Sequence, residues 1–246
     1  MMEYIGIIPA RYGSSRFPGK PLCDINGKPM IWHVHNSVSK WDKWKDIYVA
    51  TDDVRIWNEC KKYDIKCIMT QDCHTDCLDR AAEIVEILEA ENKGADRYII
   101  IQGDEPLFEA DTLNCDLSAD IINFYTEVQK SIEKYDGNAV KVAVSETEKA
   151  IYFSRYSIPY HNPETMRSKD DVIIYKQIGV YVFSGEKLKL YASMRPTYLE
   201  NIEGIGLLRF LENDIPIQMR YTKYDSVSVD TEEDRQRIVE MINNNE

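Results

Sequence analysis

The chain is short of positive charge. Its 246 residues include 30 lysines and arginines against 42 aspartates and glutamates, which gives a formal net charge of −12. Nucleic acids and anionic lipid surfaces are bound mainly through clustered cations, so a surface of this sign disfavours both. We therefore expect neither a nucleic acid nor a membrane surface as a partner.

Long apolar runs are also absent. No stretch approaches the roughly 20 apolar residues of a membrane-spanning helix. The start of the chain, MMEYIGIIPA, lacks the basic segment and long apolar segment of a secretory signal. Hydrophobic residues make up 43% of the sequence, an ordinary share for a globular protein with a sizeable core. We expect a cytoplasmic globular protein.

The six cysteines lack the spacing of a metal site. Cys73, His74 and Cys77 lie close together, but no second CxxC or HxxxH pair is present to complete a tetrahedral zinc site. The sequence therefore disfavours zinc, and it leaves open whether this cluster has any role. Without a secretion signal, we expect reduced thiols rather than a disulfide framework.

Short apolar runs alternate with stretches of helical periodicity. In residues 78–92, for example, Ala81, Ile84, Val85 and Leu88 recur at steps of three and four, which marks one buried helix face. This alternation predicts an α/β fold with a mostly parallel mixed sheet. We expect one domain over residues 1–246, with an insertion at 145–175. The expected strands cover 4–8, 47–50, 65–69, 98–101, 139–144, 175–183 and 215–221, and the expected helices cover 30–38, 54–63, 78–92, 199–213 and a capped final helix after 230.

A basic, glycine-rich segment follows the first expected strand. Residues 9–22 read PARYGSSRFPGKPL and carry the cations Arg11, Arg16 and Lys20. Backbone N–H groups of such a turn can approach phosphate oxygens, and fixed cations then neutralise the phosphate charge. Since the segment is neither GxxxxGKS/T nor GxGxxG, a simple basic surface turn remains the alternative.

Two aspartates are placed where such a ligand needs a metal. Asp104, in QGDEP, ends an apolar strand, and Asp230, in SVDTEED, follows another. In parallel α/β folds, ligands bind at the carboxyl ends of the strands. Carboxylates there can hold magnesium on a triphosphate, as phosphoryl and nucleotidyl transfer require. The alternative for each aspartate is a turn carboxylate that caps a helix.

At this point the chain resembles a known family over nearly its whole length. The motifs IPARYGSSRFPGKPL, INGKPMI, VATDD, QGDEPL, YFSRYSIPY, LENIE and SVDTEED are similar to those of the CMP-Kdo synthetases (3-deoxy-manno-octulosonate cytidylyltransferases). The resemblance implies a nucleotide-diphospho-sugar-transferase-like (Rossmann-like) fold. It also implies an enzyme that uses CTP and Mg²⁺ to place CMP on an acidic sugar, releasing pyrophosphate, as in the making of lipopolysaccharide or capsule precursors.

The resemblance assigns roles by position. Arg11, Lys20 and Asp104 would be catalytic, and Asp104 and Asp230 would hold the metal. The residues that it implies for CTP are Ala10, Arg11, Ser14, Ser15, Lys20 and Gln102. Those that it implies for the acceptor are Arg80, Gln102, Gln177, Tyr181, Glu203 and Arg209.

Three departures from the family pattern concern the acceptor. Residues 76–80 read DCLDR where the family has SGTDR, Gln177 stands where a histidine is typical, and Gly206-Leu207 replace a glutamate and a glutamine. Each lost polar group can change binding by about 1–3 kcal/mol. We therefore expect CTP to be retained while the acceptor is a modified octulosonate or, alternatively, a small phosphonate or phosphate monoester, with arginines such as Arg155 as anion clamps. An alternative of another class is a non-catalytic nucleotide-binding relative.

The family resemblance also implies a homodimer. The stretch 152–160 is rich in aromatic side chains, which suit an interface. Packing of the same side chains against the chain's own core is the alternative. We expect dimerisation through the segment 145–175.

Overall fold

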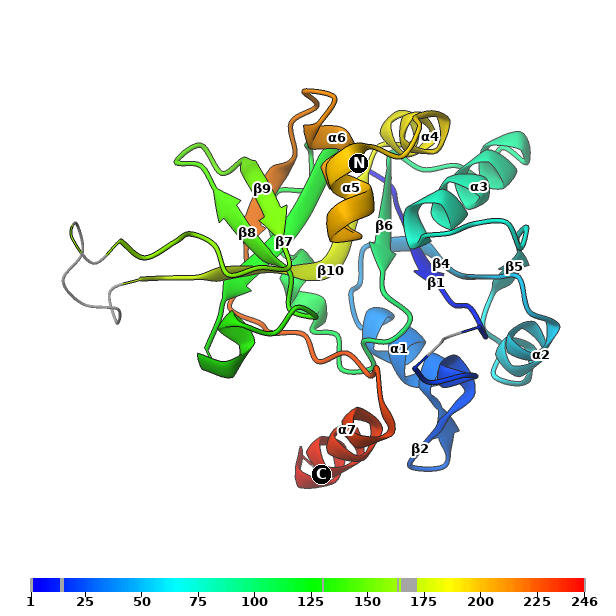
Figure 1. Cartoon of the computed structure of the whole chain (residues 1–246). Helices are drawn as coiled ribbons and strands as arrows, with labels where there is room; N and C mark the ends of the chain where they lie inside the picture. The colour runs from blue at the N-terminus through cyan, green and yellow to red at the C-terminus, as the bar shows by residue number, and fades with distance from the viewer. Residues whose placement is uncertain (1, 14–15, 130, 163, 165–171, 246) are drawn as a thin grey trace. The chain divides into compact units, whose positions relative to one another are not determined.

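The computed structural model describes residues 2–13, 16–129, 131–162, 164 and 172–245 (Figure 1). None of its described helices is both long and apolar enough to cross a membrane. The residues group into two compact units: unit 1 contains Met1–Asp120, Gly179–Ser193 and Ser226–Glu246, and unit 2 contains Ile121–Ile178 and Met194–Asp225. The described residues of the expected insertion at 145–175 belong to unit 2, and the expectation of a single domain stays a prediction.

Unit 1 is built on a mostly parallel sheet. Strand β1 (Tyr4–Pro9) lies between β4 (Trp44–Thr51) and β6 (Arg97–Ile101) and is parallel to both. Strand β5 (Cys67–Met69) continues the sheet beyond β4, and the last residues of β10 (Tyr175–Phe183) pair antiparallel with β6. Ile5, Ile7 and Ile8 are fully buried, since a central strand covered on both faces needs an apolar run.

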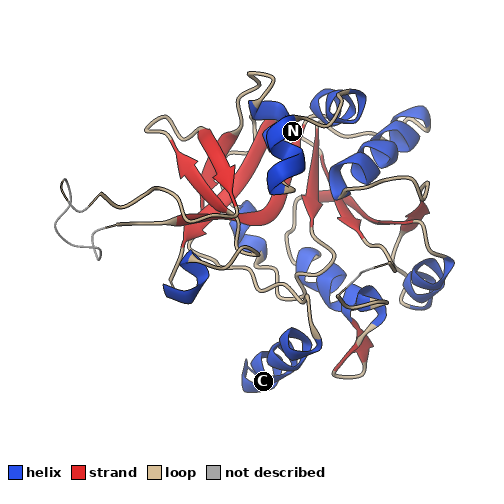
Figure 2. Cartoon of the chain, in the orientation of Figure 1, coloured by secondary structure: helices blue, strands red, loops and turns tan. Residues whose placement is uncertain are grey.

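The helices of unit 1 begin where the sequence supplies caps. Helix α1 (Met30–Val38) follows the short hairpin of β2 (Asp24–Ile25) and β3 (Lys28–Pro29). Asp53 caps α2 (Val54–Lys62), and Asp76 caps α3 (Cys77–Ala90), which lies beside α4 (Gly185–Ser193) in Figure 2. The last helix, α7 (Glu232–Asn245), starts after Thr231, whose hydroxyl accepts from the Asp234 N–H at 3.2 Å. This confirms the expected cap.

Unit 2 contains a smaller mixed set of strands. Strand β7 (Ile121–Glu127) is parallel to β11 (Gln218–Tyr221), whereas β8 (Lys141–Val144) pairs antiparallel with β9 (Ala150–Ser154) and with the first residues of β10. Two short helices complete it, α5 (Tyr198–Glu203) and α6 (Leu208–Leu211). The α/β class and the mostly parallel mixed sheet predicted from the sequence are thus confirmed.

The elements of unit 2 differ from the expected ones in two places. The single helix expected over 199–213 is interrupted, because Gly204 adopts a left-handed backbone with φ +62° and ends α5. Ile202, on α5, is 63% exposed. Strand β9 was not among the expected strands, and it forms by antiparallel pairing with β8, with Ser154 opposite Lys141 and Phe153 opposite Val142.

The turn after β6 depends on a missing side chain. A Cβ atom on Gly103 would lie closer to the Pro9 carbonyl oxygen than the 3.0 Å that real Cβ contacts respect. We predict that Gly103→Ala forces the turn away from β1 and lowers the free energy of unfolding by about 1–3 kcal/mol. Gly137→Ala is the control, since a Cβ there meets no atom within 4 Å. Urea denaturation of both variants tests this, and equal stability of the two would contradict it.

Candidate active site

The glycine-rich segment after β1 is closed by a tight turn. Gly19 has a left-handed backbone, φ +74°, and its N–H donates to the Tyr12 carbonyl at 2.9 Å. A Cβ at Gly19 would lie 3.0 Å from the Tyr12 ring, so the close approach favours glycine. The short 3₁₀ helix η1 (Lys20–Leu22) begins directly after this turn. The turn therefore fixes where the side chain of Lys20 starts.

Helix α2 holds the same segment from the side. The Arg55 guanidinium stacks on the Tyr12 ring, 3.3 Å from its centroid, and donates to both carboxylate oxygens of Asp53 at 2.9 and 2.6 Å. Arg55 thus joins the glycine-rich segment to the residue that caps α2. No signal in the sequence pointed to this contact.

Lys20 lies between the two aspartates that the sequence singled out. Its ammonium group donates to Asp104 Oδ2 at 2.7 Å and to Asp230 Oδ1 at 3.1 Å, although the aspartates are 126 positions apart. Arg16 donates to the same Asp230 oxygen at 3.0 Å. Burial alone would lower the pKa of Lys20, but the two carboxylates outweigh burial and raise that pKa above its ordinary value. The cluster therefore carries a lysine that stays charged at neutral pH.

Backbone contacts lock the two aspartates in place. The Val229 N–H donates to the Asp104 carbonyl at 2.9 Å, which fixes the residue before Asp230 to the turn after β6. The Asp230 N–H in turn donates to Asp234, in the first turn of α7, at 3.1 Å. The main chain at both aspartates is thus held in place by hydrogen bonds.

This arrangement suits a divalent cation. Asp104 and Asp230 both reach one cationic atom, so a metal placed there would find two hard oxygen ligands. Among the residues that the structure describes, no group of three or more His, Cys, Asp or Glu side chains could hold a metal on its own. The remaining ligands would have to come from water or from phosphate oxygens of a substrate, as magnesium usually requires.

Gln102 lies in the turn that carries Asp104. Its side-chain amide donates to the Cys77 sulfur at 3.1 Å and hydrogen-bonds the hydroxyl of Tyr181, which is 8% exposed. Burial, followed by the charge of Asp76, raises the pKa of Cys77 to about 12, and burial also raises the pKa of Tyr181. Gln102, Cys77 and Tyr181 therefore form an uncharged, hydrogen-bonded cluster.

The residues that the resemblance implies for nucleotide or acceptor differ in their exposure and in their contacts. Arg11 is exposed, and the Ala10 N–H donates to the Ala50 carbonyl at 2.9 Å. Arg80 is 3% exposed and binds Asp52 at 3.0 Å and the Thr70 hydroxyl. Ser14 and Ser15 lie outside the described residues. Their roles, and that of Arg80, stay predictions.

In unit 2, Glu203 anchors α5 to the end of β9. Its carboxylate accepts from the Ser154 hydroxyl at 2.7 Å, the Arg155 N–H at 2.8 Å and the Tyr152 hydroxyl at 3.3 Å. Burial would raise the pKa of Glu203, but these hydrogen bonds hold that pKa below its usual value. Gln177 differs: its side-chain oxygen is buried and finds no hydrogen-bond partner in the described part of the chain.

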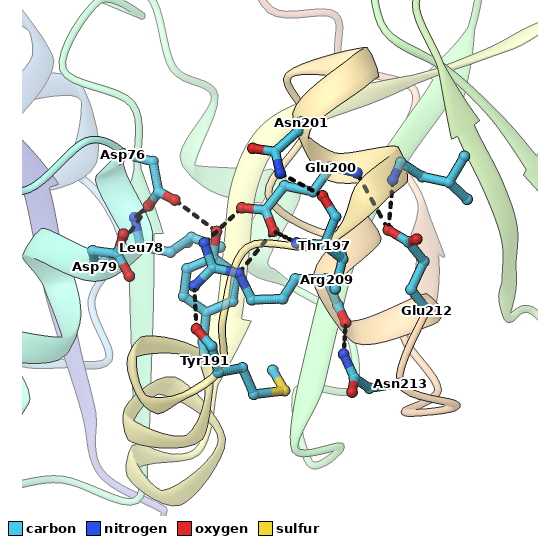
Figure 3. A network of polar contacts seen from close by, with 12 residues as sticks. Asp76, Leu78, Asp79, Tyr191, Thr197, Glu200, Asn201, Arg209, Glu212 and Asn213 are labelled. Atoms are coloured by element: carbon cyan, nitrogen blue, oxygen red, sulfur yellow. Dashed lines mark hydrogen bonds and ion pairs between the residues drawn. The ribbon is translucent and has the colours of Figure 1, made fainter.

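Arg209 is a buried partner of Glu200. Figure 3 shows its guanidinium facing the Glu200 carboxylate, to which it donates at 2.8 and 2.6 Å, and the side chain is almost fully buried. Figure 3 also shows Asp76 accepting from the Tyr191 hydroxyl at 2.6 Å while capping α3. Leu207 is 1% exposed and belongs to the core of unit 2. Arg209 and Leu207 therefore have structural partners already.

A mostly parallel α/β sheet with a basic glycine-rich segment after its first strand and two aspartates around one lysine defines a nucleotidyltransferase-like protein. Residues 5–219 match the family model described as "Cytidylyltransferase". The chain belongs to the cytidylyltransferase family, as the resemblance predicted.

Individual relatives are similar over nearly the full length. The chain is 39% identical over 236 residues to the 8-amino-3,8-dideoxy-manno-octulosonate cytidylyltransferase of Shewanella pealeana, covering 93% of this chain and 94% of that protein. It is 38% identical to the 3-deoxy-manno-octulosonate cytidylyltransferase of Thermodesulfovibrio yellowstonii, covering 95% of each. A solved structure of CMP:2-keto-3-deoxy-manno-octonic acid synthetase complexed with CTP matches with a TM-score of 0.87 at 30% identity, covering 99% of this chain and 100% of that one.

The buried ion pair of Arg209 and Glu200 allows a test of whether Arg209 stabilises the fold or binds the acceptor. Arg209→Met leaves the Glu200 carboxylate buried without its cation, so we predict a loss of about 3–5 kcal/mol in the free energy of unfolding. Arg220→Met is the control, because Glu148, which Arg220 pairs with, is 57% exposed, and we expect a loss under about 1 kcal/mol. Chemical denaturation measures both. Unchanged stability of Arg209→Met with a raised KM for the acceptor would show a binding role instead.

Proposed function

We propose that this protein transfers CMP from CTP to the anomeric hydroxyl of a 3-deoxy-octulosonate (Kdo-type) acid and releases pyrophosphate. The observation that carries the proposal is the convergence of Asp104 and Asp230 on Lys20, beside the glycine-rich segment. The activities for which its relatives are named support the same donor and class of acceptor. CTP is a cytoplasmic nucleotide, which supports the cytoplasm as the place of action.

The proposed roles follow from charge. Arg11 and Lys20 bind the triphosphate, and Asp104 and Asp230 hold Mg²⁺, which when bound neutralises phosphate charge. The acceptor hydroxyl loses its proton and its oxygen attacks the α-phosphorus in line, while the bond to the bridging oxygen of pyrophosphate breaks. The chain's contribution is to position the two reactants and to stabilise the developing negative charge. No side chain needs to act as a nucleophile.

The first test is release of pyrophosphate from CTP with Mg²⁺ and an octulosonate acceptor. Asp104→Asn keeps the shape of the side chain but removes its charge, and we predict a fall in kcat of about 100-fold or more. Asp42→Asn changes an exposed aspartate and serves as the control. Equal rates for Asp104→Asn and the wild type would overturn the metal assignment. Binding of CTP without turnover of any acid, Kdo-type or phosphonate, would favour a non-catalytic binding protein.

One observation favours an amino-substituted acceptor. The side-chain oxygen of Gln177 is buried with no hydrogen-bond partner in the described residues, and an unsatisfied buried acceptor is costly. An ammonium group on the acceptor could donate to it, whereas a hydroxyl is a weaker partner because its hydrogen bond is not charge-assisted. We therefore propose that the 8-amino analogue is preferred over Kdo itself.

Competition between the two acids tests this preference. We predict a higher kcat/KM for the 8-amino analogue, by about 10-fold, since a charge-assisted hydrogen bond contributes about 1.5–3 kcal/mol. Gln177→His should shift the ratio towards Kdo, because a histidine can itself become a donor. Gln177→Glu, which keeps an acceptor oxygen, should retain the preference for the amine. An unaltered ratio in both variants would remove Gln177 from the acceptor site.

We also propose a homodimer formed through unit 2. Two exposed apolar side chains, Tyr198 at 74% and Ile202 at 63%, stand one helical turn apart on α5. Glu203 fixes the end of α5 to β9, which presents Ile151 at 61% exposure and pairs with β8 alone in the described sheet. Exposed aromatic and aliphatic groups on two joined elements suit an interface.

Sedimentation tests the dimer directly. We predict that Ile202→Asp shifts the protein from dimer to monomer in analytical ultracentrifugation, because a charge in the centre of an apolar interface loses its water without gaining a partner. Val54→Asp, at a residue that is 60% exposed on α2 in unit 1, should leave the dimer intact. A monomeric wild type, or dissociation by Val54→Asp instead, would contradict the proposed surface.

A further inference from the structure

The proposed metal ligands are already paired with cations from the chain itself. Lys20 binds Asp104 and Asp230 at once, at 2.7 and 3.1 Å, and Arg16 binds the same oxygen of Asp230 at 3.0 Å. The side chain of Lys20 is only 13% exposed, so its contacts are poorly screened by water. Both cations belong to the segment proposed to bind the triphosphate.

A lysine and a divalent cation compete for such a place. Magnesium lies about 2.0–2.1 Å from its oxygen ligands, which is closer than the Lys20 nitrogen comes to either carboxylate. The two positive charges would repel each other at this separation, so the lysine must withdraw when the metal arrives. Moving the Lys20 ammonium group away from the two carboxylates costs free energy unless that group pairs with another anion.

The protein supplies few ligands for a metal that binds without nucleotide. Two carboxylates are only part of a divalent cation's ligand set, and the described residues contain no group of three acidic, histidine or cysteine ligands. A bound triphosphate supplies what the protein lacks. Its oxygens can complete the ligand set of the metal, and they can also pair with Lys20 and Arg16. The long, flexible stem of Lys20 allows this exchange while the turn at Gly19 stays in place.

We propose that Lys20, assisted by Arg16, keeps Asp104 and Asp230 closed to free divalent metal, and that the triphosphate opens them by drawing these two cations onto itself. Metal and nucleotide then bind together, and the protein without nucleotide holds no metal at these carboxylates. This inference rests on the proposed function, because it takes CTP as the triphosphate.

The experiment measures Mn²⁺ binding by the loss of the electron paramagnetic resonance signal of free Mn²⁺, in the absence of nucleotide. We expect Lys20→Met to bind Mn²⁺ at least about 10-fold more tightly than the wild type, since a charge at this distance commonly shifts an equilibrium by one to three powers of ten. Lys45→Met, which removes an equal charge from an ion pair with Glu3, should behave as the wild type. Lys20→Met/Asp104→Asn should lose the gained affinity, which places the metal at Asp104.

A second arm adds CTP without an acceptor. The wild type should then retain Mn²⁺ together with the nucleotide, whereas Lys20→Met should bind CTP more weakly. Tight Mn²⁺ binding by the wild type without CTP, equal to that of Lys20→Met, overturns the inference and leaves the proposed function standing. Failure of the wild type to retain Mn²⁺ with CTP overturns the proposed function itself. If circular dichroism shows that Lys20→Met is unfolded, Lys20→Gln replaces it under the same criteria.

Discussion

Repulsion between two carboxylates is the constraint on which the site depends. Asp104 and Asp230 come from distant parts of the chain and approach one another closely enough to share Lys20. Like charges at this distance destabilise a fold unless a cation lies between them. The fold supplies that cation from the segment after β1, and it fixes the geometry by the backbone bond from Val229 to Asp104. The fold and the candidate site thus depend on the same charges.

The sheet explains why these residues meet. Because β1 and β6 are parallel neighbours, the segments that follow them leave the sheet at the same edge. Gly103 permits the turn after β6 to pass against Pro9, and Gly19 permits the segment after β1 to fold back on Tyr12. The site is therefore a product of strand order and two glycines, with Lys20 and Asp104 in segments that follow strands and Asp230 shortly before α7.

Periodicity and strand ends predicted part of this region. Strand β1 and helix α1 follow from apolar periodicity, and the rule for parallel strands placed the glycine-rich segment and Asp104 at one edge of the sheet. Asp230 follows no strand directly, because residues 222–230 form no strand and the backbone bond from Val229 to Asp104 places it. Periodicity did not predict the end of α5, which the left-handed backbone of Gly204 determines. It also did not predict strand β9, which forms by pairing with β8. It also could not show that the arginine at position 209 has a buried carboxylate partner, because that depends on the packing of two short helices.

Cys77 illustrates how a fold can place a thiol beside the candidate site without making that thiol reactive. The thiolate is the form that reacts with oxidants and alkylating reagents. With its pKa raised to about 12, the sulfur of Cys77 stays protonated and serves as a hydrogen-bond acceptor for Gln102. Cys73 and Cys115 are the exposed thiols of the described residues, and a maleimide reaches them most readily. Spectroscopic labels can therefore be attached at these two thiols while the cluster around Gln102 stays chemically untouched.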